Sequence, residues 1–419
     1  MISLIISAIK IVILLGFLVT IHELGHFIVA KLCKVKVNEF AIGFGPVLLK
    51  KQGKETKYQL RLIPLGGFVS MEGEDERSNE KGAFNKVSII KRIAIVAAGG
   101  LVNIFFAIIV YFGLQTYQGN NVTTEVTSCT PGYSAEQSGI LPGDIIKKIN
   151  GKNVRRQADI NNIVSKSNGN KLSVLVNRNG EDINFDITPT LYEYYKTGIY
   201  LASETDTTIQ GFESSGSIEN QGFKTGDILV SANGVNIENN ASKLSEILQN
   251  DSNGDKITFV VKRANNELTI EANPVKVQKF MLGVQLKIAD NTFSNNAYYA
   301  IFKTTDFTFS IVDNIKMLFT GRVSTNDLMG PVGISSVVAK TNGIQEFIYI
   351  LALISLSLGV TNLLPFPPLD GGKIVILIIE AIRRKPLEEK HEIAIQMVGF
   401  GLMIVLSLYV TYNDIVRII

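Results

Sequence analysis

The segment "VTIHELGHFIVAK", residues 19–31, places two histidines and a glutamate inside a long apolar run near the start of the chain. Ionisable side chains are costly to bury at membrane depth, and those found there usually serve a function. The chain has only three histidines in 419 residues, and two of them, His22 and His26, lie in this segment. The segment therefore combines an expected membrane span with an expected chemical site.

Four segments are apolar and long enough to cross a bilayer as helices, which takes about 20 residues. They are residues 3–32, 93–112, 347–364 and 393–410. The first lacks both the positive start and the small-residue cleavage site of a signal peptide, so we expect a retained span. Residues 374–382 form an apolar run too short to cross, which we expect to be a packed or interfacial helix. The sequence predicts a polytopic α-helical membrane protein with four transmembrane helices.

The connections between the expected spans indicate the orientation. Residues 34–92 and 373–390 are rich in lysine and arginine, and such connections remain in the cytoplasm. The long region between spans two and three is then outside the cell, as are both termini. The net charge of +3 and the lack of a basic stripe indicate no nucleic-acid partner. Cys33 and Cys129 fall on opposite sides of the membrane, which argues against a disulfide and against a cysteine-ligated metal.

The outer region contains an internal repeat. "GILPGDIIKKINGKNV", residues 139–154, matches "GFKTGDILVSANGVNI", residues 222–237, without a gap. A period of this length suits two tandem small domains, and the pattern resembles PDZ domains of bacterial proteases. That resemblance implies α+β domains that bind extended peptides, such as peptide C-termini, at a sheet edge; alternatively, both are spacers or size filters. "TGIYL", residues 197–201, and "MLGVQL", residues 281–286, are expected late in the first and second copies, which indicates a circularly permuted strand order.

"HELGH" is an H-E-x-x-H motif. Residues four apart lie on one face of a helix, so His22 and His26 can bind one metal ion. Zinc in catalytic sites takes three protein ligands and leaves a position for water. Glu23 is placed to act on that water as general base. The alternative is two core histidines beside an incidental glutamate, which the rarity of histidine in this chain disfavours.

A third ligand is expected near the inner end of span three. "TNLLPFPPLDGGK", residues 361–373, contains Asp370. Spans one and three run in the same direction, so their inner ends meet on the same side of the membrane. The prolines in this segment break the helix, and irregular backbone at that depth is tolerated only in protein or beside a wet cavity. The alternative for Asp370 is an N-cap of the following helix.

H-E-x-x-H in a first span together with N-x-x-P-x-x-x-L-D-G in a later one resembles the site-2 protease family of intramembrane zinc metalloproteases. The tandem PDZ-like repeat is similar to the bacterial RseP/RasP type. The resemblance covers nearly the whole chain and implies a zinc metalloendopeptidase of the cytoplasmic membrane, with one zinc per chain. It implies regulated intramembrane proteolysis of single-span membrane proteins, such as trimmed anti-sigma factors and remnant signal peptides. Membrane lipid is the other implied partner.

The resemblance also implies substrate-binding residues. "GFGP", residues 43–46, and "PLGGFVSMEGE", residues 64–74, resemble the family's membrane-associated β-hairpin region, which presents substrate as an added strand. This implies substrate contacts for Gly66 and Gly67, and the later motif implies them for Asn362 and Pro365. Asn362 has the alternative of a hydrogen bond inside its helix. "AAGGLVN", residues 97–103, departs from the family's usual Gly-Pro and leaves the shape of span two open.

These expectations divide the chain into five parts. Residues 1–118 hold spans one and two with the hairpin region, 119–203 the first PDZ-like domain and 204–288 the second. Residues 289–346 form an amphipathic linker, and 347–419 hold spans three and four. The competing interpretation of function is a catalytically inactive PDZ-bearing membrane adaptor. Glu23 favours the enzyme, because an adaptor has no use for a base beside a zinc site.

Overall fold

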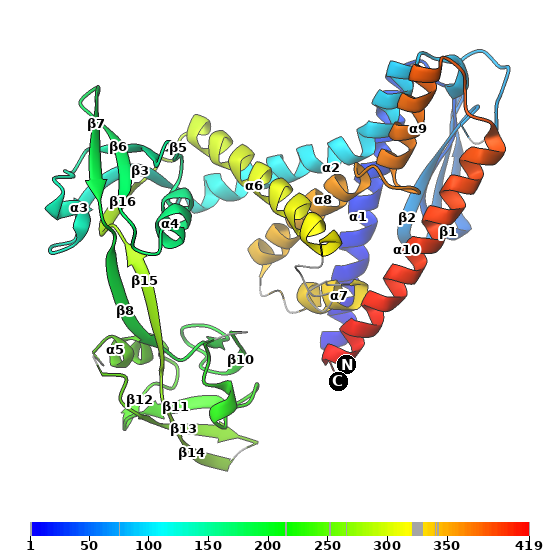
Figure 1. Ribbon diagram of the computed structural model, residues 1–419. Coiled ribbons are helices and arrows are strands. Elements are labelled where there is room, and N and C mark those ends of the chain that lie inside the picture. The colour runs from blue at the N-terminus through cyan, green and yellow to red at the C-terminus, as the bar shows by residue number, and fades with distance from the viewer. Residues whose placement is uncertain are drawn as a thin grey trace. The chain divides into compact units, whose positions relative to one another are not determined.

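The computed structural model describes the chain apart from residues 1, 75, 214–215, 251–252, 265, 321–329, 340, 342 and 419. Part of the expected linker, residues 321–329, therefore lies outside the described residues. The chain divides into two compact units. The helical unit comprises residues 1–121 and 290–419, and the repeat unit comprises Val122–Ala289. Figure 1 shows the helices of the first and the strands of the second.

The helical unit contains four helices that are long and apolar enough to cross a membrane. These are α1 (Ile2–Leu32), α2 (Ile89–Gln118), α8 (Ile344–Asn362) and α10 (Glu389–Ile418). The remaining helices of the unit are α6 (Phe293–Phe319), α7 (Pro331–Ala339) and α9 (Asp370–Arg383). The four expected spans fall on the four long helices, with ends that differ by at most eight residues, and the short apolar run lies in α9.

Small residues bring α1 and α8 close to α2. A Cβ atom added to Gly25 on α1 would lie 2.6 Å from the carbonyl oxygen of Ala98 on α2. One added to Gly359 on α8 would lie 2.6 Å from the carbonyl oxygen of Gly100. Helices in a membrane associate through such close packing, because the lipid chains remove the hydrophobic driving force. The glycine pair in the second span thus lies where the three helices converge.

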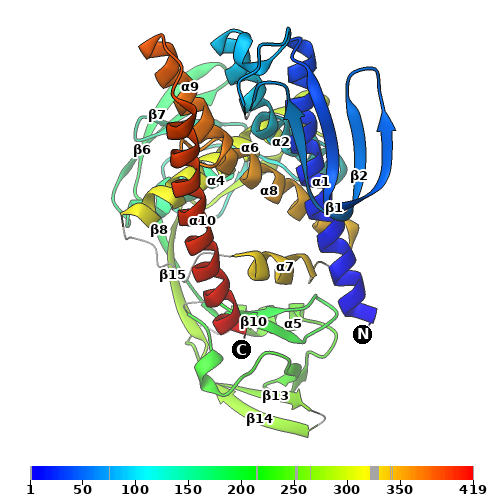
Figure 2. The same cartoon turned by 90° about the vertical axis from the view of Figure 1, so that its right-hand side faces the viewer.

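The expected hairpin is present beside α1, between the first two spans. Strands β1 (Val37–Gln52) and β2 (Lys57–Met71) pair antiparallel (Figure 2). In this sheet residues 39–42 of β1 pair with β2 on both sides, with residues 57–60 and with residues 67–70. Among the described residues, the edges of the sheet without a backbone partner are therefore residues 67–71 of β2 and 47–52 of β1. The outer part of the sheet exposes large apolar side chains, including Leu48, Leu49 and Leu62. Exposed apolar surface of this kind marks a contact with lipid or with another chain.

The repeat unit contains two similar subdomains. The first has the sheet order β16-β3-β4-β6-β7, and the second has β12-β11-β13-β14 together with the pair β10-β9. The first sheet comprises β3 (Val122–Cys129), β4 (Ile145–Ile149), β6 (Leu172–Arg178), β7 (Glu181–Ile187) and β16 (Val284–Ile288), with β5 (Lys152–Asn153) beside β4. The second comprises β9 (Ile199–Leu201), β10 (Ile209–Phe212), β11 (Ile228–Ala232), β12 (Val235–Asn236), β13 (Ile257–Arg263) and β14 (Asn266–Ala272). Helices α4 (Gln157–Lys166) and α5 (Ser242–Asn250) occupy matching places in the two copies.

The strand exchange between the copies corrects one expectation. The "MLGVQL" segment was expected in the second copy, but its strand β16 pairs with β3 of the first. The "TGIYL" segment was expected in the first copy, but its strand β9 pairs with β10 of the second. The second subdomain is therefore inserted into the first, and a boundary at residues 203/204 would cut between two paired strands. An antiparallel ribbon of β8 (Thr190–Lys196) and β15 (Val275–Met281) connects the two and returns the chain to the first sheet.

Each copy contains the same internal ion pair. The Asp144 carboxylate accepts hydrogen bonds from Arg178 at 2.8 Å and from the backbone N–H of Leu141 at 2.9 Å. Asp227 makes the same contacts with Arg263 at 2.7 Å and with the N–H of Lys224 at 2.9 Å. Both aspartates are buried. The Gly-Asp turn of the repeat is thus fixed by an arginine that the alignment of the two motifs did not include.

Candidate metal centre

The two histidines of the motif face each other on α1. His22 and His26 are one helical turn apart, and their Nε2 atoms lie 3.2 Å from each other. The imidazole planes are inclined by 80° with centroids 4.8 Å apart. Both residues are buried. The helix therefore presents two ring nitrogens to one point, as the i, i+4 spacing predicts.

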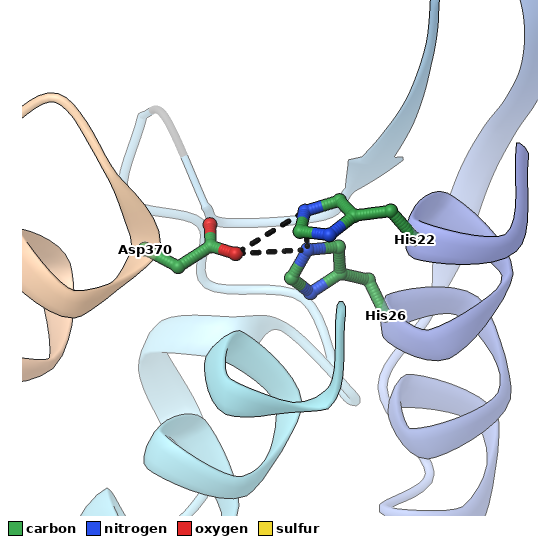
Figure 3. Close-up of side chains that lie close together, drawn as sticks. All are labelled: His22, His26 and Asp370. Carbon is green, nitrogen blue, oxygen red and sulfur yellow. Dashed lines mark hydrogen bonds and ion pairs between the residues drawn. The ribbon is translucent and has the colours of Figure 1, made fainter. Parts of the chain in front are cut away.

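Asp370 joins the histidines from a distant part of the sequence. Its Oδ2 atom lies 3.2 Å from His22 Nε2 and 3.4 Å from His26 Nε2 (Figure 3). Asp370 is the first residue of α9, and the N-cap position of that helix is held by Leu369 instead. A Cβ added to the next residue, Gly371, would lie 2.1 Å from the carbonyl oxygen of Leu364. The glycine lets the chain fold back tightly, which directs Asp370 at α1.

The hydrogen bond of His26 determines which ring nitrogen is free. Its Nδ1 lies 2.9 Å from the backbone carbonyl oxygen of Ile95 on α2. A carbonyl only accepts, so Nδ1 carries the proton and Nε2 keeps its lone pair. A ligating histidine usually donates its other ring N–H in this way. His26 is therefore oriented to offer Nε2 to a metal ion.

Gly99 on α2 forms the wall behind the two imidazoles. A Cβ atom at this position would lie 2.3 Å from His26 Nε2 and 2.7 Å from His22 Nε2. Side-chain carbon atoms do not approach ring nitrogens so closely, so any larger residue would displace the rings. Gly99, the glycine that also stands in the usual Gly-Pro pattern, thus supplies room for the histidines, whereas the departing residue, Gly100, faces Gly359 and Leu363.

The donor set fits a zinc ion. Two nitrogens and one oxygen form a triangle with edges of 3.2–3.4 Å. Zinc ligands at about 2.0–2.2 Å in a tetrahedron lie about 3.3–3.6 Å apart. The Oδ2 atom of Asp370 is buried and accepts no hydrogen bond among the described residues. Lone pairs that converge in this way, with no proton donor between them, are suited to a cation.

Glu23 lies beside this triangle. It lines a cavity of about 230 Å³ together with His22, His26 and Asp370. The side chain is partly buried, and a Cβ atom at Gly67 on β2 would lie 3.4 Å from its Cγ. The cavity can therefore hold a water molecule and a peptide group next to both the carboxylate and the metal position.

The four expected substrate residues take different positions. The Asn362 amide nitrogen lies 3.4 Å from His22 Nδ1, at the C-terminal end of α8. Gly67 is next to Glu23, whereas Gly66 packs against the ring of Phe44 and has a φ of +133°. Pro365 is exposed and is not among the residues that line the cavity, where Pro367 and Pro368 are found. Asn362 and Gly67 are thus the two that the fold brings to the site.

Two residues of α2 at the site had no role in the sequence-based prediction. Gly99 contacts both rings, and Asn103 places its amide nitrogen 3.5 Å from His22 Nδ1. They are four residues apart and so share one face of the helix. Asn103 carries the one side-chain amide in the expected span 93–112. A polar amide in an apolar span was the signal that could have identified it.

The sequence profile of peptidase family M50 matches residues 10–406. The chain belongs to this family. It is 32% identical to a protein from Vibrio cholerae named as a zinc metalloprotease, over 97% of this chain and 98% of that protein. It is 28% identical to the regulator of sigma E protease of Haemophilus influenzae, over 97% and 98% of the two chains. The chain is accordingly an intramembrane metalloprotease that uses zinc.

A comparison with solved structures finds a PDZ domain. The crystal structure of the HtrA3 PDZ domain bound to a phage-derived ligand covers 22% of this chain and 93% of its own length. The identity is 20% and the TM-score is 0.18.

Proposed function

We propose that His22, His26 and Asp370 hold the zinc ion and that Glu23 is the general base of peptide-bond hydrolysis. The observation that carries this proposal is the triangle of two imidazole nitrogens and one carboxylate oxygen beside Glu23. Zinc in such a site lowers the pKa of a water molecule and polarises the scissile carbonyl. The Glu23 carboxylate takes the proton of the attacking water and delivers it to the leaving nitrogen.

The substrate in this proposal is the membrane segment of a single-span protein. The unpaired edge formed by residues 67–71 of β2 suits an extended substrate, because a sheet edge binds peptide by adding a strand. Gly67 at the end of β2 brings that strand next to Glu23, and the Asn362 amide is available to the substrate backbone. The relative named as a regulator of sigma E protease supports trimmed anti-sigma factors as substrates. Remnant signal peptides are also single apolar segments in the membrane, so we include them as substrates.

The orientation in the cytoplasmic membrane is also a proposal. The hairpin connection, residues 34–92, and the connection after α8 are rich in lysine and arginine, which favours the cytoplasmic side for both. The repeat unit is then outside, where its two PDZ-like subdomains keep bulky substrates from reaching the metal centre or bind peptide C-termini. An impermeant thiol reagent should reach Cys129 from outside the cell and Cys33 only from the cytoplasm. Labelling with the opposite sidedness would overturn this orientation.

The experiment on function uses Glu23→Gln, which keeps the size and hydrogen bonding of the side chain. Loss of a general base lowers the rate by about 10²–10⁴-fold. Cells with this variant should accumulate membrane proteins whose ectodomains have been trimmed, and the purified variant should bind zinc as the parent does. A control is Glu271→Gln, because Glu271 lies on β14 of the repeat unit in an exposed ion pair with Lys256, and this variant should cleave as the parent does. Undiminished cleavage by the purified Glu23→Gln variant would show that a group other than Glu23 activates the water.

A further inference from the structure

The two zinc-binding histidines do not have equivalent surroundings. Each must carry its proton on Nδ1 in order to offer the Nε2 lone pair, and that N–H then needs an acceptor. For His26 the acceptor is the Ile95 carbonyl oxygen. The neighbours of His22 Nδ1 are two side-chain amides, from Asn103 and Asn362. One of them has to supply the acceptor.

The position of Asn362 is unsuitable for this bond. Its amide nitrogen lies 3.4 Å from Nδ1 and 3.5 Å from Nε2 of His22. An atom nearly equidistant from the two ring nitrogens lies either in front of the Cε1 atom between them or over the ring face. At these distances the in-plane position would overlap Cε1, so the amide lies over the face. An imidazole N–H points outward in the ring plane, and a hydrogen bond bent so far is weak.

The position of Asn103 meets the requirement. Its amide approaches His22 at Nδ1, at 3.5 Å. The residue is completely buried, and its Oδ1 atom has no hydrogen-bond partner among the described residues. Half a turn about the terminal side-chain bond exchanges the amide oxygen and nitrogen without moving the rest of the residue. Oδ1 then faces His22 Nδ1 and accepts its proton.

The backbone of α2 holds Asn103 firmly in this place. The Ser355 hydroxyl on α8 donates to the Asn103 carbonyl oxygen at 3.0 Å. A Cβ atom at Gly359 would lie 3.2 Å from the Asn103 Cβ, so α8 leaves little room for movement. One turn earlier, Gly99 allows the same face of α2 to touch the rings. Gly99 thus lets α2 come close to the imidazole rings, and Asn103 places a side-chain amide next to His22 Nδ1.

We infer that Asn103 is the positioning residue that holds His22 in its zinc-binding tautomer, which leaves Asn362 free for substrate. This inference rests on the proposed zinc site. Asn103 contacts neither the zinc position nor the substrate, and it acts only through the His22 ring. Outer partners of this kind change metal affinity by about 10–100-fold.

The test measures zinc affinity by chelator competition in the purified full-length protein. Asn103→Leu keeps the volume but removes the acceptor, and its affinity should fall by about 10–100-fold. Asn103→Asp restores an acceptor and creates a carboxylate–histidine–zinc arrangement, so its affinity should remain within a few-fold of the parent. The visible spectrum of the cobalt-substituted protein should change in the leucine variant and be preserved in the aspartate variant.

The matched control is Gln115→Leu, which removes another buried side-chain amide on α2, twelve residues away from Asn103 along the helix. It should leave zinc affinity unchanged. Parental affinity in Asn103→Leu, or an equal loss in both Asn103 variants, would overturn the inference. If instead His22→Ala binds zinc as tightly as the parent, the proposed zinc site itself is wrong. That result is distinguishable from one in which only the role of Asn103 is wrong.

Discussion

Buried carboxylates in the two units have different partners. In the repeat unit, Asp144 and Asp227 each meet an arginine and a backbone N–H. In the helical unit, Asp370 meets two imidazole nitrogens, and its Oδ2 atom accepts no hydrogen bond from the part of the chain that the structure describes. A buried charge is stable only when it is paired and hydrogen-bonded. The first two sites are complete within the chain, whereas the third fits the cation that we propose for it.

The difference is also one of sequence distance. Each aspartate of the repeat unit and its arginine belong to one subdomain, and the same pair recurs in both copies. The three residues of the metal centre come from α1 and α9, which are more than 300 residues apart. The ion pairs therefore stabilise local turns, and the metal centre depends on the packing of the membrane helices. Substitutions that change the helix packing should lower the zinc affinity, and substitutions in the ion pairs should lower only the stability of the repeat unit.

The largest expected effect is that of Gly99→Ala. The added Cβ would lie 2.3 Å from His26 Nε2, so the rings must move away from the metal position. Zinc affinity should fall by at least about 100-fold, the upper end of the losses seen for outer partners of a metal. Gly113→Ala on the same helix is the control, because no described residue of another element lies within 4 Å of its added Cβ. Equal zinc affinity of both variants would show that α2 does not form the wall of the site.

A smaller effect is expected for Asp227→Asn in the repeat unit. The substitution removes the charge opposite Arg263, which keeps 29% of its side chain exposed. Breaking a fully buried pair costs about 3–5 kcal/mol, so this part-exposed pair should cost about 2 kcal/mol. Hydrogen exchange of the β11 and β13 amides should accelerate accordingly, with zinc content unchanged. Loss of zinc in this variant would contradict the independence of the two sites.

The smallest effect is the acid sensitivity of the same ion pairs. The hydrogen bonds from Arg178 hold the pKa of Asp144 below its usual value. Burial alone would raise the pKa of Asp227, but the bonds from Arg263 outweigh it and lower that pKa as well. A lowered pKa contributes stability that is present above the unfolded value, near pH 4, and is lost as the pH falls below it. Opening of the first sheet should thus become easier in acid, and less so in Asp144→Asn.

Much of the helical unit could be predicted from the sequence because its signals are local or follow from topology. The length of the apolar runs predicted the four long helices, and the i, i+4 spacing of the histidines predicted that their rings face each other. The expected direction of span three predicted that Asp370 approaches them. The role of Gly99 could not be predicted, since a glycine in a span does not reveal which side chains its missing Cβ accommodates. Asn103 was detectable as a lone amide, but its partner depends on helix rotation.

The repeat unit shows where sequence reasoning was wrong. Two similar copies contain interchangeable strands, and the sequence alone does not say which sheet takes β9 and which takes β16. Pairing of β8 with β15 decides the matter, because it returns the chain to the first subdomain. That ribbon forms between segments about 80 residues apart, a distance over which no local pattern determines pairing. The two copies were recognisable, and their nesting was not.

The most direct test of the account is the zinc content of the purified protein with both site histidines replaced. The parent should contain about one zinc per chain, and His22→Ala/His26→Ala should contain none. The control is His391→Ala, which removes the third histidine, an exposed residue beside Glu388, and should keep the parental content. Undiminished zinc in the double variant would contradict the assignment of the metal centre to the H-E-x-x-H motif.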